Sequence, residues 1–244
     1  MKKCALITGA SRGIGKAIAI QLAKDHSLHI LINYSTNIDA AISVKEYIES
    51  EGGSAEVIQF NVQEYLEVLN KLKEWKENNP NDLIEVLVNN AGITRDNLLL
   101  WMSKEDWQSV VDVSLKGFFN VTNYILQDMI KLKKGRVINI SSISGLKGNA
   151  GQTNYAAAKG GLIAASKSLS YEIARRGITV NVIAPGFISS DMTKDLPEKE
   201  IKKMIPTRRF GKTEEVAHLA SFLASDKASY ITGEVINING GIYS

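Results

Sequence analysis

The chain has 244 residues, 44% of them hydrophobic, and a formal net charge of +3 at pH 7, which suits one large α/β domain or two small ones with a sizeable core. It contains no apolar run as long as a membrane helix, no apolar stretch and cleavage site of a signal peptide near its start, and no Lys/Arg run typical of a nucleic-acid-binding arm. The single cysteine, Cys4, excludes an intramolecular disulfide and favours the reducing cytoplasm.

Short runs rich in Val, Ile and Leu alternate with longer helical patterns along the whole chain. We expect strands at residues 4–8, 28–33, 55–60, 84–89, 136–141, 178–184 and 234–239. Helical patterns lie between them, among them residues 15–25, 39–52, 104–131 and 154–176. Because the strands are almost continuously apolar, helices should cover both faces of the sheet. The sequence predicts an α/β fold: one Rossmann-like domain over residues 1–244, with a doubly wound parallel sheet of about seven strands.

A glycine-rich turn, "TGASRGIG" at residues 8–15, follows the first predicted strand. Its glycines leave room for a pyrophosphate beside the backbone, and the helix that follows would direct its N–H groups and positive dipole end at that anion. A Walker phosphate loop is excluded, because Ala10 replaces its first glycine and Ala17 replaces its Ser or Thr. We therefore predict a dinucleotide site that includes Gly9, Ser11, Arg12, Gly13, Ile14 and Gly15.

The end of the second strand bears on the choice of dinucleotide. An NAD site usually has an Asp or Glu there for the ribose 2′-hydroxyl, but this chain has "NYSTN" at residues 33–37. Hydroxyls of Ser35 or Thr36 can donate to a 2′-phosphate, and Arg12 offers a planar cation, unless it is merely a solvated turn residue. We predict NADP(H).

Tyr155 and Lys159 are four residues apart in a predicted helix and therefore share a face. An ammonium group near a phenol lowers the phenol's pKa toward the working range, although most such pairs on solvated helices have no role. Ser141 and Ser142 end the strand that precedes this helix, where open α/β sheets place their ligands. This placement favours a catalytic interpretation of the pair.

Residues 186–212 are charged, contain prolines and show no strand pattern. Two interpretations are open: a solvated surface loop, or a mobile lid over the site, since the segment follows the carboxyl end of a strand. The three histidines match no metal-ligand spacing, so we expect no metal site.

Together, these motifs resemble the short-chain dehydrogenase/reductase family. The likeness rests on the glycine turn, "NNAG" at 89–92, Ser142, "YAAAK" at 155–159 and "APGFI" at 184–188. Residues 89–99, 148–162, 176–193 and 231–241 are similar to bacterial 3-oxoacyl-[acyl-carrier-protein] reductases, the ketoreductases of fatty-acid elongation.

The resemblance implies a role for each catalytic side chain. Tyr155 would protonate the keto oxygen as hydride arrives from the nicotinamide, Ser142 would hold that oxygen, and Lys159 would lower the tyrosine pKa and bind the ribose. Other cofactor contacts implied in this way are Ser35, Asn61, Val62, Asn90, Ala91, Gly92, Pro185, Gly186 and Ile188.

Ser114 departs from the family pattern, which has Asn at this position. That Asn is thought to help hold a water in the proton relay, so the serine predicts either a disabled relay or a water held by a carbonyl of a distorted helix turn. Serine supports such a distortion when its hydroxyl competes for backbone carbonyls one turn earlier. We keep Ser114 among the catalytic residues and expect an active enzyme.

The resemblance also implies partners. Acyl carrier protein would dock on Lys133 and Arg176 near the active-site mouth, unless both are ordinary solvated charges. The helical residues 104–130 and 154–176 have apolar and small-residue faces that predict a homotetramer. We expect no nucleic-acid or membrane partner.

Two alternatives to this function differ in class. One is a ketoreductase of the same family that acts on acetoacetyl-CoA or on a polyketide or aryl-polyene intermediate. The other is a dinucleotide-binding regulator that has lost its chemistry, which the joint presence of Ser142, Tyr155 and Lys159 disfavours.

Overall fold

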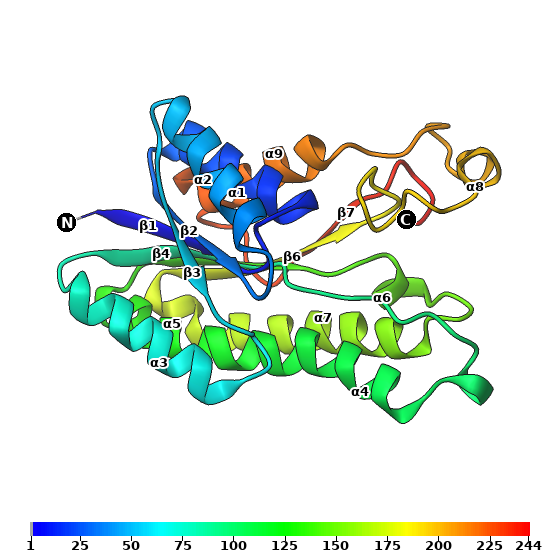
Figure 1. The fold of residues 1–244 in the computed structure, drawn as a ribbon, viewed down its shortest axis with the longest axis horizontal. Coiled ribbons are helices and arrows are strands. Elements are labelled where there is room, and N and C mark those ends of the chain that lie inside the picture. Colours follow the sequence, from blue (N-terminus) through cyan, green and yellow to red (C-terminus); the bar gives the residue numbers. More distant parts are fainter. Residues whose placement is uncertain (1) are drawn as a thin grey trace.

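The computed structural model describes residues 2–244, which form one seven-stranded, wholly parallel sheet in the order β3-β2-β1-β4-β5-β6-β7 (Figure 1). The predicted fold is confirmed, and each predicted strand is present. The strands are β1 (Lys3–Ile7), β2 (His29–Tyr34), β3 (Ser54–Gln59), β4 (Leu83–Asn89), β5 (Gly135–Ile140), β6 (Ile178–Pro185) and β7 (Val235–Ile238).

Helices cover both faces of the sheet (Figure 1). On one face lie α1 (Gly13–His26), α2 (Ile38–Ser50) and α9 (Thr213–Ala224), and on the other α3 (Tyr65–Asn78), α4 (Lys104–Val111), α5 (Gly117–Leu132) and α7 (Thr153–Ile173). Two short helices, α6 (Ser144–Lys147) and α8 (Glu198–Met204), lie beyond the carboxyl ends of the strands. Among residues 2–244, no helix is long and apolar enough to cross a bilayer.

The alternation of side chains along β1 divides the core into two layers. Ala5 and Ile7 pack with α1, α2 and α9, whereas Cys4 and Leu6 pack with α3 and α5. Burial and nearby carboxylates raise the pKa of Cys4 to about 12, so this thiol stays protonated and serves as a small core residue.

The predicted helix over residues 104–131 is interrupted. Residues Asp112–Lys116 form a π turn between α4 and α5, in which the Gly117 N–H bonds to the Asp112 carbonyl five residues earlier. One extra residue in the turn shifts the phase of the helix that follows. Apolar spacing across 104–131 continues on both sides of the turn and gives no sign of it; only the departure at Ser114 indicated a distorted helix turn here, as one of two possibilities.

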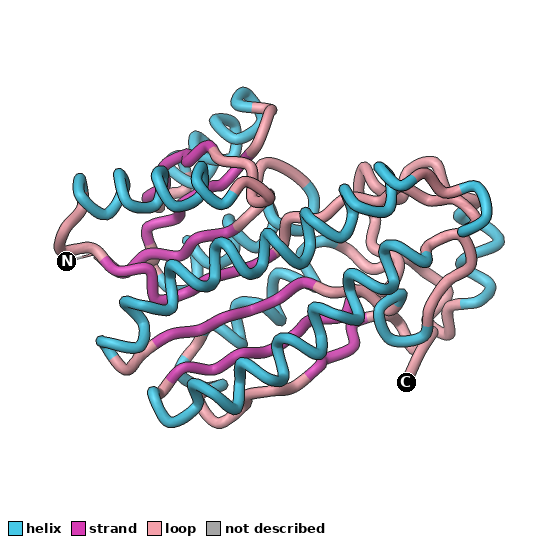
Figure 2. Tube along the Cα trace, turned by 90° about the horizontal axis from the view of Figure 1, so that it is seen from below, coloured by secondary structure: helices cyan, strands magenta, loops and turns pink. Residues whose placement is uncertain are grey.

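The order of the strands defines where a ligand can bind. β2 and β4 lie on opposite sides of β1, so the chain winds away from β1 in both directions. Such a switch point opens a crevice beyond the carboxyl ends of the strands. Figure 2 shows the strands from below, with long loops gathered beyond one end of the sheet.

Candidate active site

The glycine turn after β1 has a backbone conformation and close contacts that side chains would prevent. Gly9 and Gly13 have φ values of +63° and +55°, in the left-handed region that favours glycine. A Cβ on Gly15 would lie 2.5 Å from the Gly9 carbonyl oxygen, so the start of α1 packs directly on the turn. The Asn33 side chain, at the end of β2, accepts from the Gly9 N–H at 3.1 Å and fixes the turn against the sheet. The result is an open cradle of backbone N–H groups at a helix N-terminus, which fits a pyrophosphate.

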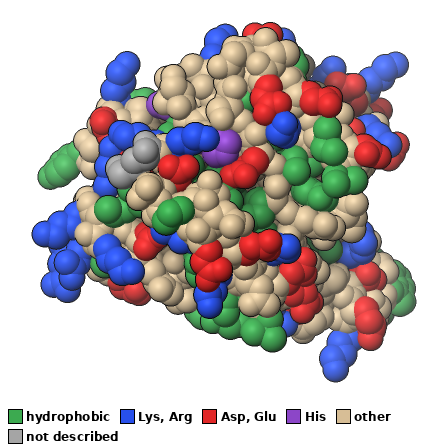
Figure 3. Space-filling model, turned by 60° about the vertical axis from the view of Figure 1, so that its left-hand side comes forward, with side chains coloured by type: hydrophobic (Ala, Val, Ile, Leu, Met, Phe, Trp, Pro, Cys, Tyr) green, Lys and Arg blue, Asp and Glu red, His purple; other side chains and the backbone are tan. Residues whose placement is uncertain are grey.

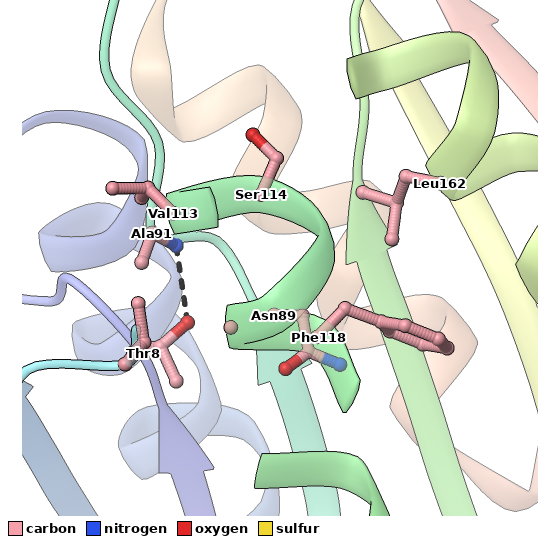
Figure 4. Close-up of a pocket in the computed structure, with 9 residues that line it drawn as sticks. Thr8, Asn89, Ala91, Val113, Ser114, Phe118 and Leu162 are labelled. Carbon is pink, nitrogen blue, oxygen red and sulfur yellow. Dashed lines mark hydrogen bonds between the residues drawn. The ribbon is translucent and has the colours of Figure 1, made fainter. Parts of the chain in front are cut away.

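The segment Asn90–Gly92 is bonded to the same turn from the β4 side. The Thr8 hydroxyl oxygen accepts from the N–H groups of Asn90 (2.9 Å) and Ala91 (3.0 Å), the second of which Figure 4 shows. The Asn90 side chain donates to the carbonyls of Thr8 and Gly9. Thr8, which the sequence analysis did not single out, therefore joins the two loops that border the cofactor crevice.

The side chains predicted to select the cofactor lie on the surface at the ends of β1 and β2. Arg12, Ser35 and Thr36 are exposed, and Arg12 makes no side-chain capping bond to α1. Val62 is buried beyond β3, where it contacts Gly117 and its carbonyl accepts from the Asn120 side chain at 2.8 Å. Asn61 is partly buried and caps its own loop by accepting from the Gln63 N–H.

The catalytic candidates come together where β5 ends and α7 begins. Lys159 is 3% exposed, and its Nζ donates to the Ile140 carbonyl at 2.9 Å and lies 5.7 Å from the centre of the Tyr155 ring. Ser142, two residues after Ile140, accepts from the Ser144 N–H at 3.1 Å. A Cβ on Gly92 would lie 3.2 Å from Lys159 Nζ, so the lysine also borders the loop after β4.

Protein surroundings shift the pKa values of both members of the pair. Desolvation lowers the pKa of Lys159 to about 8 and raises the pKa of Tyr155 to about 12, while a hydrogen bond with Ser142 acts to lower the tyrosine value. Burial therefore outweighs the lowering that we expected the lysine to produce. At neutral pH the phenol is protonated.

Ser141 and Asn154 hold α7 in place, a role that the sequence did not indicate for either residue. The Ser141 hydroxyl donates to the Lys159 carbonyl at 2.9 Å, and the Asn154 side chain, fully buried, donates to the carbonyls of Arg95 and Asp106. They fix both the lysine and the start of the helix that bears Tyr155. Asn154 directly precedes Tyr155, but a buried Asn at a helix start has no sequence pattern of its own.

Ser114 lies in the π turn, 3% exposed, and its hydroxyl is the one buried side-chain oxygen or nitrogen without a partner among residues 2–244. It lines a small cavity of about 10 Å³, room for about one water, between the π turn and the ends of β1 and β4. Figure 4 shows its hydroxyl turned away from Thr8 and Asn89. The helix is distorted at this position, but the expected bond from the serine hydroxyl to a carbonyl one turn earlier is absent, so the prediction of how serine supports the distortion is wrong.

The predicted lid, residues 186–212, begins where β6 ends. Pro185 is buried, its carbonyl accepts from the Ile143 N–H, and Gly186 packs against Asn239. Beyond Gly186 the segment has a small apolar cluster of its own, formed by Ile201, Ile205 and Phe210 with Phe187 and Ile242 packed on it. A bridge between Ile188 and Gly211 closes its base. The segment includes α8 and so is more ordered than a bare loop.

Lys133 and Arg176 are not at the active-site mouth of their own chain. Lys133 follows α5 and precedes β5, Arg176 precedes β6, and Gly177 packs against the Lys133 carbonyl. Both therefore lie at the amino ends of the strands, whereas Ser142 follows the carboxyl end of β5. From Tyr155 to Arg176 the chain runs 21 residues, along α7 and the 3-10 turn Ala174–Arg176 that follows it, about 30 Å at the rise of an α-helix. The prediction that placed them beside the mouth is wrong for a single chain.

Within residues 2–244, no three His, Cys, Asp or Glu side chains are grouped as metal ligands. The site thus consists of a backbone cradle, a protonated phenol, a buried lysine and a serine hydroxyl. Such a set can bind an anionic dinucleotide and deliver a proton to an oxygen beside it.

Comparison with known proteins agrees with a site that binds a dinucleotide and delivers a proton. A family model described as enoyl-(acyl carrier protein) reductase matches residues 9–243. The 3-oxoacyl-[acyl-carrier-protein] reductase FabG of Staphylococcus epidermidis is 46% identical over the full length of both chains. The corresponding reductases of Synechocystis sp. and Escherichia coli K12 are 48% and 44% identical, covering 98% and 99% of this chain and 96% and 97% of theirs. A solved structure from Agrobacterium tumefaciens, described as a gluconate dehydrogenase, superposes with a TM-score of 0.94 at 31% identity, over 98% of this chain and 95% of that one.

Proposed function

The chain belongs to the short-chain dehydrogenase/reductase family. We propose that it is an NADPH-dependent oxidoreductase. Its reaction reduces the 3-keto group of a β-ketoacyl thioester bound to acyl carrier protein, as in fatty-acid elongation. The observation that carries this proposal is the convergence of Ser142, Tyr155 and Lys159 beside the glycine cradle. Full-length identity of 44–48% to curated reductases supports the substrate class.

The crevice suits a nicotinamide dinucleotide. Its pyrophosphate would lie on the N–H groups of the Gly9–Gly15 turn, its adenosine between that turn and Asn61–Val62, and its nicotinamide toward Tyr155 and Ile188. The bound cofactor supplies the hydride. Lys159, which lies between Gly92 and the Tyr155 ring, would donate to ribose hydroxyls.

Tyr155 is the proton donor in this scheme. With a pKa of about 12 it carries its proton at pH 7, and the proton passes to the keto oxygen as that oxygen gains negative charge. Ser142 donates a hydrogen bond to the same oxygen and orients it. Lys159, whose pKa is about 8, is largely protonated at pH 7 and stabilises the phenolate that remains.

NADPH is favoured over NADH by the end of β2. A carboxylate there would repel a 2′-phosphate, whereas this chain has Ser35 and Thr36 hydroxyls and the exposed Arg12 guanidinium. Arg12 forms no ion pair within residues 2–244, so its guanidinium does not have to be released before a phosphate binds.

A carrier protein that docks on Lys133 and Arg176 must serve the active site of another copy. Helices paired about a two-fold axis perpendicular to them run antiparallel, so the partner's end of α7 lies beside this chain's start of α7. The exposed side chains of Phe119 on α5 and Tyr171 on α7 offer apolar surface for such pairing. We infer a homotetramer in which one copy's basic pair flanks its neighbour's Tyr155. Light scattering that gives a stable monomer at micromolar concentration contradicts it.

Segment 186–212 would close over the bound substrate, because it is anchored at its base and has an apolar cluster of its own that would let it move as a unit. The reducing cytoplasm suits both the proposed reaction and the lone Cys4.

One experiment tests the function and its nearest rivals. Purified enzyme is assayed for NADPH consumption with acetoacetyl and longer β-ketoacyl groups, each presented on acyl carrier protein and on coenzyme A. Higher kcat/KM on carrier-bound substrates supports the proposal, and higher kcat/KM on coenzyme A thioesters favours an acetoacetyl-CoA reductase. No turnover of any β-ketoacyl thioester, with NADPH still bound, would indicate a dinucleotide-binding regulator.

A further inference from the structure

A second cavity lies at the amino-terminal end of the sheet, far from the catalytic residues. Its volume is about 150 Å³, it is partly open to solvent, and it is lined by the starts of β1, β4 and β5 and the ends of α1 and α9. Figure 3 turns this end of the molecule forward and shows basic and acidic side chains interspersed on it. The charged and titratable lining residues are Lys3, His26, Glu85, Lys134, Arg136 and Asp226.

Arg136 is the one fully buried charge in this lining. Its side chain is 8% exposed, and its Nε and Nη1 groups donate to the carbonyls of Ser225 (3.4 Å) and Gly135 (3.0 Å). Nη2 donates to the Asp226 carboxylate at 3.1 Å, but that side chain is 85% exposed. A buried guanidinium thus has a solvated carboxylate as its counter-ion, and such an exposed partner is held only weakly.

The turn that bears Asp226 does not depend on its side chain. The Ala228 N–H bonds to the Ser225 carbonyl, and the Ser229 N–H bonds to the Asp226 carbonyl. Arg136 likewise keeps its two backbone acceptors when the aspartate moves away. The carboxylate can therefore be exchanged for another without disturbing the cavity wall.

The net charge of the lining residues favours a ligand with a single negative charge. Lys3, Lys134 and Arg136 face Glu85 and Asp226, which leaves three cations against two carboxylates with histidine neutral. Glu85 is shared between the two lysines at 3.8 and 3.3 Å. If a ligand carboxylate replaces Asp226 at Nη2 of Arg136, the aspartate turns to solvent and the cavity still binds one anion through a charge-assisted hydrogen bond.

The remaining wall is apolar, formed by Leu28, Val86 and Ala224. A cavity of about 150 Å³ is known to hold a molecule of about six heavy atoms such as benzene. We propose that this cavity is a binding site for a short-chain monocarboxylate of about that size, with its carboxylate on Arg136 and its alkyl chain against Leu28 and Val86. The site is separate from the catalytic crevice.

Butyrate tests the proposal, with uncharged butyramide as the shape-matched control. Binding to the full-length protein is measured by calorimetric titration at constant ionic strength. Asp226→Asn removes the internal competitor and should lower the butyrate Kd at least about fivefold. Glu46→Gln removes an equal charge from an exposed carboxylate on α2, outside the cavity, and should leave the Kd unchanged. Arg136→Gln should raise the Kd at least tenfold.

Three results overturn the proposal. Butyramide could bind as well as butyrate, which would exclude recognition of the charge. Asp226→Asn and Glu46→Gln could have equal effects, which would indicate a general charge effect. Butyrate could compete with NADPH, which would place it in the catalytic crevice. The comparison of butyrate Kd values between Asp226→Asn and Glu46→Gln tests the proposal even if Arg136→Gln fails to fold.

Discussion

The two ends of the sheet differ in how their polar groups are held. At the carboxyl end, Thr8, Asn90 and Ser141 bond to backbone groups, and Lys159 is buried on a carbonyl. At the amino end, Lys3 and Lys134 share Glu85 through long, partly exposed ion pairs. Catalysis needs groups that do not reorganise during the reaction, whereas binding of exchangeable partners tolerates solvated charges. Substitutions should therefore affect the rate at the first end and recognition at the second.

The largest effect is expected at the carboxyl end, for Tyr155→Phe. Loss of the proton donor should lower kcat/KM about 10³-fold, or about 4 kcal/mol of barrier, with NADPH binding and circular dichroism unchanged. Tyr171→Phe removes the same hydroxyl from an 84% exposed position on α7 and should leave the rate unaltered. A Tyr155→Phe enzyme at near wild-type rate would refute the mechanism.

The buried lysine should make stability depend on pH. The pKa of Lys159 is lowered from 10.5 to about 8 on folding, so between those values the unfolded chain binds more protons than the native one. The unfolding free energy should therefore rise with pH from about 8 to 10.5, by up to about 3 kcal/mol from this group. Below pH 8 both states are protonated, and the contribution no longer changes.

Denaturant titrations at several pH values, comparing the wild type with Lys159→Met, isolate that contribution. The Lys159→Met variant should lose the rise in unfolding free energy between about pH 8 and 10.5. Lys167→Met, at an exposed position of the same helix, should keep it. Parallel curves for wild type and Lys159→Met would mean that the native lysine titrates like an unfolded one.

Cofactor choice should depend on the surface beyond β2. We expect kcat/KM with NADPH to exceed that with NADH at least tenfold, or about 1.4 kcal/mol. Ser35→Asp should lower the NADPH value and spare the NADH value, because the new carboxylate repels only the 2′-phosphate. Equal use of both cofactors by the wild type contradicts the assignment.

The sequence predicted the strands, the sheet and the glycine cradle because each follows from local pattern: apolar runs, glycine spacing and a residue's place after a strand. It also indicated Tyr155 and Lys159 through helical spacing, although Ser142 needed the family resemblance to be joined with them. What it missed depends on contacts between distant segments. The Asn154 bonds to Arg95 and Asp106 and the π turn at Asp112–Lys116 leave no periodic signal.

The misplacement of Lys133 and Arg176 has a topological cause. Each lies in a turn that enters a strand, and parallel strands put all such turns at the end opposite the ligand crevice. The family resemblance from which we predicted the pair gives matching positions only, and it does not say that α7 runs the length of the sheet between Tyr155 and Arg176.

Reversing the charges of Lys133 and Arg176, at the amino end of the sheet, should weaken recognition of the carrier protein and leave the rate of the chemical step intact. Lys133→Glu with Arg176→Glu should raise KM for a carrier-bound substrate about tenfold and leave KM for the coenzyme A thioester and both kcat values nearly unchanged. Lys147→Glu is the decisive control, because Lys147 is exposed beside Ser142 in the same chain. If only Lys147→Glu raises KM for the carrier-bound substrate, the carrier protein docks at the active-site mouth of the same chain and not on a neighbouring copy.

The smallest effect is expected inside the carboxyl end, at Ser114. The π turn places backbone carbonyls and a cavity of about 10 Å³ beside the crevice, so a relay water there can be held by the backbone whichever side chain is present. Ser114→Asn should therefore change kcat by less than about tenfold, or 1.4 kcal/mol of barrier.

Ser114→Ala sharpens this test, because it removes a buried hydroxyl that has no partner. No protein group within residues 2–244 bonds to this hydroxyl, so the alanine variant should be about as stable as the wild type to denaturant, with kcat close to normal. A large loss of kcat in Ser114→Ala would show that the hydroxyl itself takes part in proton transfer. A wild type that is inert toward every β-ketoacyl thioester but rescued by Ser114→Asn would show that the relay requires the asparagine side chain, and the backbone of the π turn would then be insufficient for the chemistry.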